Sequence, residues 1–379
     1  MRILLLTSEF PPFNGGVATY ARELAGAAIS AGHEVVVLAP DYGTDQRDLD
    51  VTLPGRVVRF AGKAANAKGL IGRIMAARRI LMAERFDVVH AVDWPFFIPL
   101  ALSPRGEAKA LLTVHGSELI YMQAPKRRKI LGLLGFWRPG WARWIGNSKY
   151  TVDLLHRAFP AVRVEDARAI PLAVGDAWRR RRVPRSEARE KFSLTERDLV
   201  IVSLGRVVPR KGHLDLADAF MALPSDIADR LQWWIIGPLI DPVHAEELQR
   251  RIAGLRCSAE LFGSLPTDEV VVRLCAADLF CLPGYQDGDG RVEGFGLVFL
   301  EAGAFGVPSI ATRSGGIPEA VVEGVGGVLV PERDPRALAE AIFNVLGDAG
   351  RRAELATGAE ALAAEATWHK VMAATYEAD

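Results

Sequence analysis

A glycine-rich stretch with two glutamates, residues 287–301, combines the residue types with the clearest chemical use in the chain. It has the sequence DGDGRVEGFGLVFLE, so Glu293 and Glu301 stand eight positions apart. A Pro-Gly break at 283–284 precedes it, and the apolar run that follows has helical spacing. We therefore predict a strand, a loop and a helix that begins near Gly296. Backbone N–H groups would then lie at the positive end of that helix, where anions bind, at Gly294, Phe295, Gly296 and Leu297.

The two glutamates would have different tasks around such a helix start. Glu301 would lie over the second helical turn, where a carboxylate can accept hydrogen bonds from ribose hydroxyls. Glu293, before the helix, would accept hydrogen bonds from the hydroxyls of a bound sugar. From spacing alone, a helix-capping acid and a surface acid remain a fair alternative.

A second chemical motif pairs two cations, Arg206 and Lys211, five positions apart in a loop after the apolar segment 200–204. Cations at a strand end inside a cleft are costly unless anions balance them. Arginine offers a bidentate fork and lysine a compact point charge, which together suit a diphosphate. We expect Arg210, which lies between them in the sequence, to point to solvent. A solvated loop is the alternative explanation of this motif taken alone.

Two further glycine turns lie before predicted helices, Gly15-Gly16 and the run Ser314 to Glu319 with Gly315-Gly316 at its centre. Glycines let the backbone approach a ligand closely because no side chain intervenes. The first strand is not followed by G-x-G-x-x-G, which argues against a dinucleotide oxidoreductase, and the chain has no P-loop motif. No set of His, Asp and Glu has metal-ligand spacing, so we expect no metal and no cofactor.

One histidine, His115, ends the apolar segment 111–114 and would point toward the same ligand-binding edge. A lone histidine is more often structural than catalytic, and Ser117 or Glu118 can simply cap a turn. Its chemistry is left open by the residues alone.

Apolar strand patterns alternate with helical patterns along the whole chain, which predicts an α/β fold of right-handed βαβ units in doubly wound parallel sheets. At 379 residues the chain is long enough for two such domains. We expect a first Rossmann-like domain at 1–175, a hinge at 176–184, a second at 185–362, and a C-terminal helix at 363–379 that returns to the first. The carboxyl ends of both sheets should face a cleft, where open α/β sheets bind ligands.

Composition restricts the compartment and the partners. The net charge is zero, yet residues 1–182 hold 27 Lys and Arg against 16 Asp and Glu. Either the first half faces an anionic membrane surface or acidic acceptor, or the two halves attract each other. The three cysteines lack metal-ligand spacing and indicate a reducing compartment. No signal peptide or membrane-spanning run is apparent, so we expect a cytoplasmic protein that touches a membrane at most from its surface.

Taken together, the motifs resemble those of the retaining glycosyltransferases of family 4, also called glycosyl transferases group 1. The resemblance covers nearly the whole chain: Gly15-Gly16, Val88-Val89-His90, Thr113 to Gly116, Gly146-Asn147-Ser148, Gly205-Arg206 with Lys211-Gly212, the Glu293 and Glu301 pair, and Ser314 to Glu319. Each motif alone is weak, and their combination is specific. It implies the GT-B fold, in which two Rossmann-like domains face each other across a deep cleft.

The resemblance also implies residue roles. Arg206 and Lys211 would bind the diphosphate of a UDP-, GDP- or ADP-linked sugar, and Glu301 its ribose. Glu293 and the 294–297 amides would hold the donor sugar and distal phosphate. His115 would lie near the reacting sugar. The remaining implied contacts are Gly15 and Gly16 near the phosphates, and Gly263 and Leu265 near the base.

The implied reaction is a front-face displacement in which the leaving phosphate accepts the acceptor's proton, with the cations in place of a divalent metal. The residues supply no carboxylate pair of the kind a retaining hydrolase uses. Closure of the two domains would exclude water.

The acceptor is the least defined partner. Basic residues stand beside apolar ones in two segments, at Lys63, Lys68, Arg73, Arg78 and Arg79, and at 126–129 ahead of an apolar and aromatic run. Such patterns suit an anionic membrane surface and a lipid-linked acceptor, although a buried core face with solvated cations fits equally. Glycans and small molecules stay open as acceptors. We expect no nucleic acid partner, and the sequence gives no oligomeric state.

Two other functions compete with sugar transfer. A nucleotide-sugar epimerase shares the two-domain fold but lacks the Arg/Lys and Glu-x7-Glu spacing. A non-catalytic sugar-nucleotide-binding subunit would be expected to lose Arg206, Lys211 or Glu293 first, and all three are present.

Overall fold

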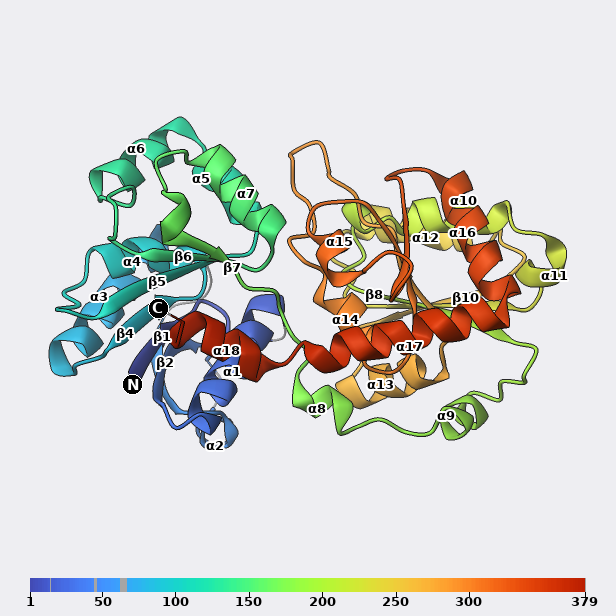
Figure 1. The fold of residues 1–379 in the computed structure, drawn as a ribbon, viewed down its shortest axis with the longest axis horizontal. Coiled ribbons are helices and arrows are strands. Elements are labelled where there is room, and N and C mark those ends of the chain that lie inside the picture. Colours follow the sequence, from blue (N-terminus) through green and yellow to red (C-terminus); the bar gives the residue numbers. More distant parts are fainter. Residues whose placement is uncertain (14, 44–45, 62–66, 379) are drawn as a thin grey trace. The chain divides into compact units, whose positions relative to one another are not determined.

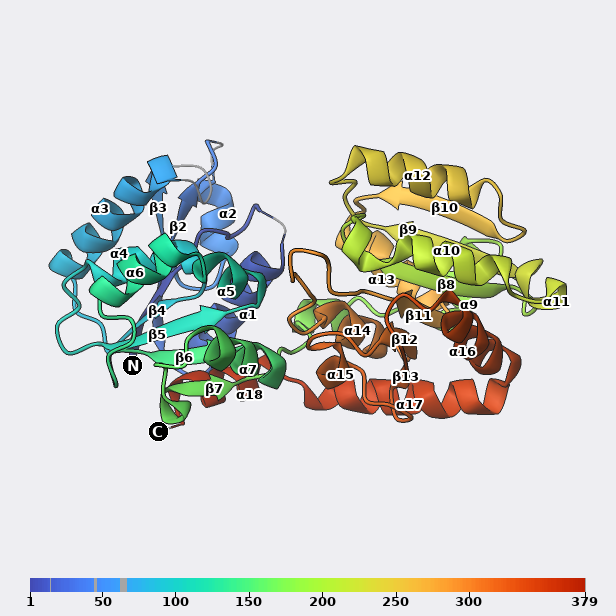
Figure 2. The same cartoon turned by 90° about the horizontal axis from the view of Figure 1, so that it is seen from above.

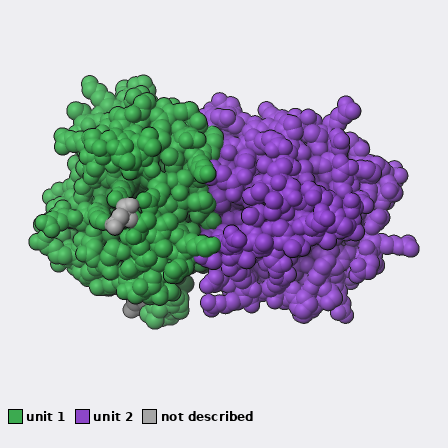
Figure 3. Space-filling view, in the orientation of Figure 1, with its two compact units in different colours: residues 1–172, 368–379 green, residues 173–367 purple. Residues whose placement is uncertain are grey.

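The chain divides into two compact units, which we describe separately from a computed structural model (Figure 1). The structure describes residues 1–13, 15–43, 46–61 and 67–378. Unit 1 comprises residues 1–172 and 368–379, and unit 2 comprises residues 173–367 (Figure 3). The expected boundaries after 175 and 362 thus differ from this division by a few residues. Part of the expected hinge is a short helix of unit 2, α8 (Asp176–Arg179).

Unit 1 is built on a seven-stranded parallel sheet in the order β3-β2-β1-β4-β5-β6-β7. Its strands are apolar because both faces of a parallel sheet are covered, and in the first strand every residue from Ile3 to Leu6 is buried. The strands are β1 (Arg2–Leu6), β2 (Glu34–Asp41), β3 (Arg56–Ala61), β4 (Val88–Ala91), β5 (Lys109–Val114), β6 (Arg143–Gly146) and β7 (Ala167–Ala169).

The helices of unit 1 connect these strands and cover the sheet (Figures 1 and 2). They are α1 (Gly16–Ser30), α2 (Arg47–Thr52), α3 (Ala67–Ala83), η1 (Trp94–Phe96), α4 (Phe97–Ala101), α5 (Ser117–Met122), α6 (Pro125–Leu133), α7 (Lys149–Ala158), η2 (Val164–Asp166) and α18 (Trp368–Tyr376). The order of the strands reverses between β1 and β4, so the carboxyl ends of these two strands flank the switch point of the sheet.

The last helix, α18, packs along α1 and completes unit 1. The hydroxyl of Tyr376 is 2.9 Å from Nδ1 of His90, a fully buried residue of β4. At the other end of α18, the ring of Trp368 lies edge-on to Tyr20 of α1, with centroids 5.7 Å apart. These buried contacts explain why aromatic residues stand at both ends of this helix.

Unit 2 repeats the architecture with a six-stranded parallel sheet in the order β10-β9-β8-β11-β12-β13. The doubly wound α/β fold predicted from the alternating pattern is therefore confirmed in both halves of the chain. The strands are β8 (Leu199–Leu204), β9 (Leu231–Ile236), β10 (Ser258–Gly263), β11 (Leu279–Leu282), β12 (Ser309–Thr312) and β13 (Gly327–Val330).

The helices of unit 2 lie between these strands and after them (Figure 1). Beyond α8 they are α9 (Arg185–Lys191), η3 (Pro209–Lys211), α10 (His213–Met221), α11 (Ser225–Ala228), α12 (Pro242–Ile252), α13 (Thr267–Ala276), α14 (Leu297–Gly303), α15 (Ile317–Ala320), α16 (Pro335–Gly347) and α17 (Ala349–Glu365). Here the strand order reverses between β8 and β11.

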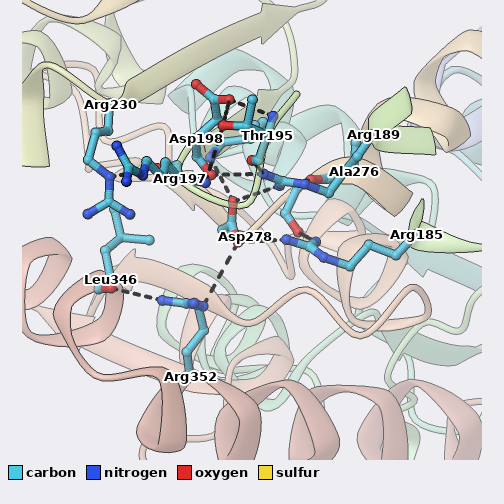
Figure 4. Close-up of polar contacts among 12 residues, drawn as sticks. Arg185, Arg189, Thr195, Arg197, Asp198, Arg230, Ala276, Asp278, Leu346 and Arg352 are labelled. Carbon is cyan, nitrogen blue, oxygen red and sulfur yellow. Dashed lines mark hydrogen bonds and ion pairs between the residues drawn. The ribbon is translucent and has the colours of Figure 1, made fainter. Parts of the chain in front are cut away.

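A buried carboxylate fastens the amino-terminal edge of this sheet (Figure 4). Asp278, directly before β11, forms ion pairs with Arg185 at 2.7 Å and Arg189 at 3.3 Å. It also accepts a hydrogen bond of 2.8 Å from the backbone N–H of Val200 in β8. Asp278 and Arg189 are both buried, so helix α9 is tied to two strands through charges that water does not screen.

We predict that Asp278→Ala lowers the free energy of unfolding by roughly 3–5 kcal/mol, because it leaves the buried Arg189 guanidinium without its carboxylate. The matched control is Asp268→Ala, which removes an exposed carboxylate 2.7 Å from Arg181 and should change stability by less than about 1 kcal/mol. Urea unfolding of the full chain measures both. Equal effects for the two variants would contradict the role assigned to Asp278.

Candidate active site

Lys211 and Glu293 meet at the switch point of the unit 2 sheet. Lys211 belongs to the loop that follows β8, and Glu293 to the loop that follows β11. The Lys211 Nζ atom donates a hydrogen bond of 2.5 Å to Oε2 of Glu293. The structure thus brings together two of the residues that the sequence singled out, although 82 positions separate them.

A third cation joins this pair and corrects one expectation. Arg210, predicted to point to solvent, has a side chain only 18% exposed and lies 3.8 Å from Oε2 of Glu293. Burial lowers the pKa of its guanidinium. The prediction was wrong because the loop after β11 folds back over this residue: the backbone N–H of Tyr285 donates to the Arg210 carbonyl at 3.0 Å. Arg206, by contrast, is exposed.

Glu293 is therefore an anion held among cations. Burial opposes its ionisation, but the charges of Lys211, Arg210 and Arg206 lower the pKa of its carboxyl below the ordinary value. The carboxylate stays charged at neutral pH and neutralises part of the cationic cluster. An incoming anion such as a phosphate would compete with Glu293 for the same cations.

The glycine turn of the run Ser314 to Glu319 fixes the backbone beside Glu293. The N–H of Gly316 donates to the Glu293 carbonyl at 2.9 Å. A Cβ at Gly316 would lie 1.9 Å from the Gly294 carbonyl oxygen, and one at Gly315 2.4 Å from that of Glu293. Any side chain at these positions would push the Glu293 loop out of place, which is the physical need for two successive glycines here.

The helix predicted to begin near Gly296 is α14, and Gly296 is its N-cap with φ of +91°. Glu301 lies in its second turn and is buried. Gly294, Phe295 and Gly296 are buried, and Leu297, the first residue of α14, is half-buried.

Three glycines shape the carboxyl edge of β8, β9 and β10. The N–H of Gly237 donates to the Gly263 carbonyl at 2.8 Å, and a Cβ at Gly237 would lie 1.9 Å from the Gly205 carbonyl oxygen. Gly263 itself has φ of +68° and open space where a side chain would be, and Leu265 is half-buried beside it in the sequence. Gly263 and Leu265, which the resemblance places near the base, are thus separated from β8 by one strand, β9. The segment after β8 leads to Lys211.

In unit 1 the predicted residues gather at the carboxyl ends of β1, β4 and β5. The Nε2 atom of His115, after β5, is 2.8 Å from the Val92 carbonyl, after β4. The His115 ring lies edge-on to Tyr20 at 5.3 Å between centroids. Gly15 caps α1, and Gly16 begins it with no atom within 4 Å of the space where its Cβ would be. The Gly-Gly turn is thus open at Gly16.

Sequence reasoning missed a buried acid in this cluster, Asp93. Both backbone N–H and hydroxyl of Ser8, after β1, donate to its carboxylate, the N–H at 3.0 Å to Oδ2. Burial raises the pKa of Asp93 to about 7, with the hydrogen bonds from Ser8 working in the opposite direction. The signal was available: Asp93 follows β4 directly, as His115 follows β5.

The loop 286–291 is a closed hydrogen-bonded turn. Asp287 accepts bonds of 2.8 Å from both the backbone N–H and Nε of Arg291, and Asp289 accepts one of 2.7 Å from Nη2 of Arg291. The two aspartates of the Asp-Gly-Asp-Gly-Arg sequence are thus paired with the arginine of the same segment. Composition alone did not reveal this pairing.

Among the described residues, no group of three or more His, Cys, Asp and Glu side chains is arranged to hold a metal ion. The three cysteines are free and buried.

The titration of Asp93 yields a prediction on stability. Its pKa of about 7 in the folded chain exceeds the ordinary value of 3.8, so folding takes up a proton between these pH values and the carboxyl favours folding more as the pH falls. The stability of wild type relative to Asp93→Asn should therefore rise from pH 7 toward pH 4, by up to about 1.4 kcal/mol per pH unit. Denaturant unfolding at several pH values measures it, with the exposed Asp153→Asn as control. A constant difference between wild type and Asp93→Asn would refute the assignment.

Comparisons with known proteins cover both units. The family described as "Glycosyltransferase Family 4" matches residues 14–177, and "Glycosyl transferases group 1" matches residues 184–361. A relative from Mycobacterium tuberculosis is 33% identical over 98% of this chain and 96% of its own length. It is named GDP-mannose-dependent alpha-(1-6)-phosphatidylinositol monomannoside mannosyltransferase. A relative from Salinispora tropica, named D-inositol 3-phosphate glycosyltransferase, is 35% identical over 94% of this chain and 79% of its own length.

Solved structures share the fold at low sequence identity. Anabaena HepE in complex with UDP and glucose superposes with a TM-score of 0.76 at 20% identity, covering 100% of this chain and 98% of that one. Sucrose-phosphate synthase from Thermosynechococcus elongatus gives 0.79 at 21% identity, covering 99% and 97%. With its two parallel sheets and matches to both family regions, the chain belongs to the group 1, family 4 glycosyltransferases of the GT-B fold, which take their sugar from a nucleotide sugar.

Proposed function

We propose that this chain is a retaining mannosyltransferase that moves mannose from GDP-mannose to a hydroxyl of an inositol-containing glycolipid. The donor and acceptor classes are supported by the printed names of relatives from Mycobacterium tuberculosis and Corynebacterium glutamicum, the latter 30% identical over 97% of this chain. The stereochemical course rests on the resemblance to the family. A soluble inositol phosphate acceptor is the narrower variant that the Salinispora relative suggests.

The observation that carries the proposal is the ion pair of Lys211 with Glu293 at the switch point of unit 2, with Arg210 beside it. A cation buried at this edge requires an anion, and without donor the carboxylate provides it. When the diphosphate binds, it would take over Lys211 together with Arg206. Glu293 would then be released to accept hydrogen bonds from the hydroxyls of the donor sugar.

In this arrangement the protein stabilises the leaving group electrostatically. Negative charge develops on the distal phosphate as its bond to the sugar breaks, and Lys211 and Arg206 lie where they can oppose that charge. The leaving phosphate oxygen accepts the proton of the attacking hydroxyl on the same face of the sugar, so the configuration is retained. No step assigned to these residues needs a divalent metal, because the cations and the 294–297 amides supply the positive charge.

The acceptor groups that we assign belong to unit 1. His115 is oriented by its contact with the Val92 carbonyl and by the Tyr20 ring. Asp93, whose carboxylate accepts a hydrogen bond from Ser8, lies after the neighbouring strand β4 and has a pKa of about 7. We assign both to the binding of acceptor hydroxyls at the switch point of the unit 1 sheet.

A peripheral membrane location is part of the proposal. No helix among the described residues is long and apolar enough to cross a bilayer. The cations expected to contact an anionic surface include four consecutive exposed residues at 126–129 in α6, while Lys63 lies outside the described residues. The buried free cysteines agree with a reducing compartment, and hence with the cytoplasmic face of the membrane.

The direct test is a transfer assay with GDP-mannose and vesicles that contain phosphatidylinositol monomannoside, with mass spectrometry of the lipid product and EDTA present. We expect a mannosylated lipid, and Lys211→Ala should lower its rate by roughly two to three decades, as for other lost donors to a developing charge. Lys191→Ala, which removes an exposed lysine paired with Glu269, should leave the rate within about twofold of wild type. Unchanged transfer in Lys211→Ala, or no transfer from GDP-mannose by wild type, would contradict the proposal.

Substitutions of Glu293 and Glu301 should have different effects on the affinity for GDP. Glu301→Ala should weaken the binding of free GDP, by about tenfold for a lost charge-assisted hydrogen bond to ribose. Glu293→Gln should bind GDP as tightly as wild type or more tightly, because it removes the carboxylate that competes with the diphosphate, while its transfer rate falls. Isothermal titration with GDP measures both, and equal weakening by the two substitutions would disprove the division of roles.

A further inference from the structure

Unit 1 contains an apolar pocket that the donor chemistry does not use. Helices α3, α4, α5 and α6 and the short helix η1 provide the residues that line it. Its volume is about 180 Å³, which compares with the ~150 Å³ apolar cavities that bind benzene. Leu70, Phe97 and Ile130 are among the side chains that line it, and Arg73 and Arg127 are the charged ones. The pocket therefore has room for roughly six carbon atoms of an apolar ligand.

Two walls of this pocket continue directly from the proposed acceptor residues. One wall, Trp94 to Ile98, begins with the residue after Asp93. The other, Tyr121 and Met122, lies in α5, whose first residue is two positions after His115. The pocket and the acceptor groups thus share the loops that follow β4 and β5.

Arg73 lines the pocket and interacts electrostatically with Asp93. It is buried, and its Nε donates to the Pro95 carbonyl at 3.2 Å. Burial lowers the pKa of its guanidinium, and the charge of Asp93 opposes that shift. A cation at this depth in an apolar wall would attract an anionic group bound between the pocket and Asp93.

Aromatic rings and a second cation form one side of the pocket. Trp94 and Tyr121 lie with ring centroids 4.9 Å apart. The guanidinium of Arg127 stacks on the Tyr121 ring at 3.3 Å and donates to the Tyr121 carbonyl at 3.0 Å. Tyr121 is 43% exposed, so this cation and ring are accessible to a ligand.

The helices around the pocket are apolar and basic on their exposed surfaces. On α3, Ile71, Met75 and Met82 are 66–71% exposed, and on α6 Ile130 and Leu133 are 50% and 76% exposed. Neither helix contains an aspartate or glutamate. Large exposed apolar side chains among unopposed positive charge are suited to the boundary between lipid headgroups and acyl chains.

We propose that this pocket binds the first part of one hydrocarbon chain of the anionic lipid acceptor, with its phosphate held by Arg73 and Arg127. The inference rests on the proposed function in one respect, the lipid nature of the acceptor. The apolar lining takes the chain, the two arginines take the phosphate, and the shared loops bring the headgroup to Asp93 and His115. The pocket therefore selects for a chain-bearing acceptor over its free headgroup.

The experiment measures binding and not transfer, so that it stands apart from the donor chemistry. The probes are inositol 1-phosphate and lysophosphatidylinositols with chains of 4, 6, 8 and 10 carbons, below their micelle concentrations, titrated calorimetrically into the full chain. In wild type we expect the affinity to rise roughly three- to fourfold per methylene over about the first six carbons, as for buried methylenes, and then to level off.

Two neighbouring substitutions on α3 make a matched pair. Leu70→Trp fills the pocket, and Ile71→Trp adds the same side chain at an exposed position outside the lining. Leu70→Trp should abolish the dependence on chain length and leave the affinity for inositol 1-phosphate and GDP unchanged. Ile71→Trp should behave as wild type.

Three results would overturn the inference: no dependence on chain length in wild type, equal loss in both variants, or loss of GDP affinity together with lipid affinity in Leu70→Trp. Failure of mannosyl transfer with retained chain-length dependence would refute the proposed function and leave the pocket assignment standing.

Discussion

The constraint on which the candidate site depends is the compensation of buried positive charge at the switch point of the unit 2 sheet. Lys211 is buried and could not be kept there as an isolated cation. The carboxylate of Glu293, 2.5 Å away, balances it. In the function that we propose, a diphosphate would replace the carboxylate at Lys211, and Arg210, 3.8 Å from Oε2 of Glu293, would remain beside that carboxylate. The ion pair would thus hold Lys211 in position for the diphosphate.

Glycines hold this pair in place by letting backbones approach. Gly212, with φ of +74°, has no room for a Cβ, which would lie 2.0 Å from the Pro283 carbonyl oxygen. Gly316 packs equally closely on Gly294. The loops after β8, β11 and β12 are thus in close backbone contact at Gly212, Gly315 and Gly316. The positions of the charged groups are therefore fixed by the close packing of the main chain and not by the side chains themselves.

The sequence predicted the fold well because its information is local. Continuous apolar runs mark the strands of a parallel sheet, and the apolar segments 200–204 and 111–114 lie within β8 and β5. The predicted helix start near Gly296 also agrees with the structure, since a glycine of positive φ suits a helix cap. The sequence identified candidate site residues at strand ends where the motif was distinctive, as at Lys211 and Glu293.

What the sequence did not predict depends on contacts between distant segments. The position of Arg210 follows from the loop after β11, more than 70 residues away in the chain. Burial in the folded unit raises the pKa of Asp93, against the hydrogen bonds from Ser8, and no local sequence pattern shows that burial. The apolar pocket requires four helices whose order in space no periodicity encodes. The pairing of the acids at 286–291 with Arg291 is likewise seen only in the structure.

The most direct test of the central claim is a crystal structure of the chain with GDP. The account predicts that the diphosphate lies within hydrogen-bond distance of Lys211 Nζ and the Arg206 guanidinium, and that the distance from Lys211 Nζ to Glu293 lengthens beyond 2.5 Å. A diphosphate bound elsewhere, with the Lys211–Glu293 hydrogen bond intact, would contradict it.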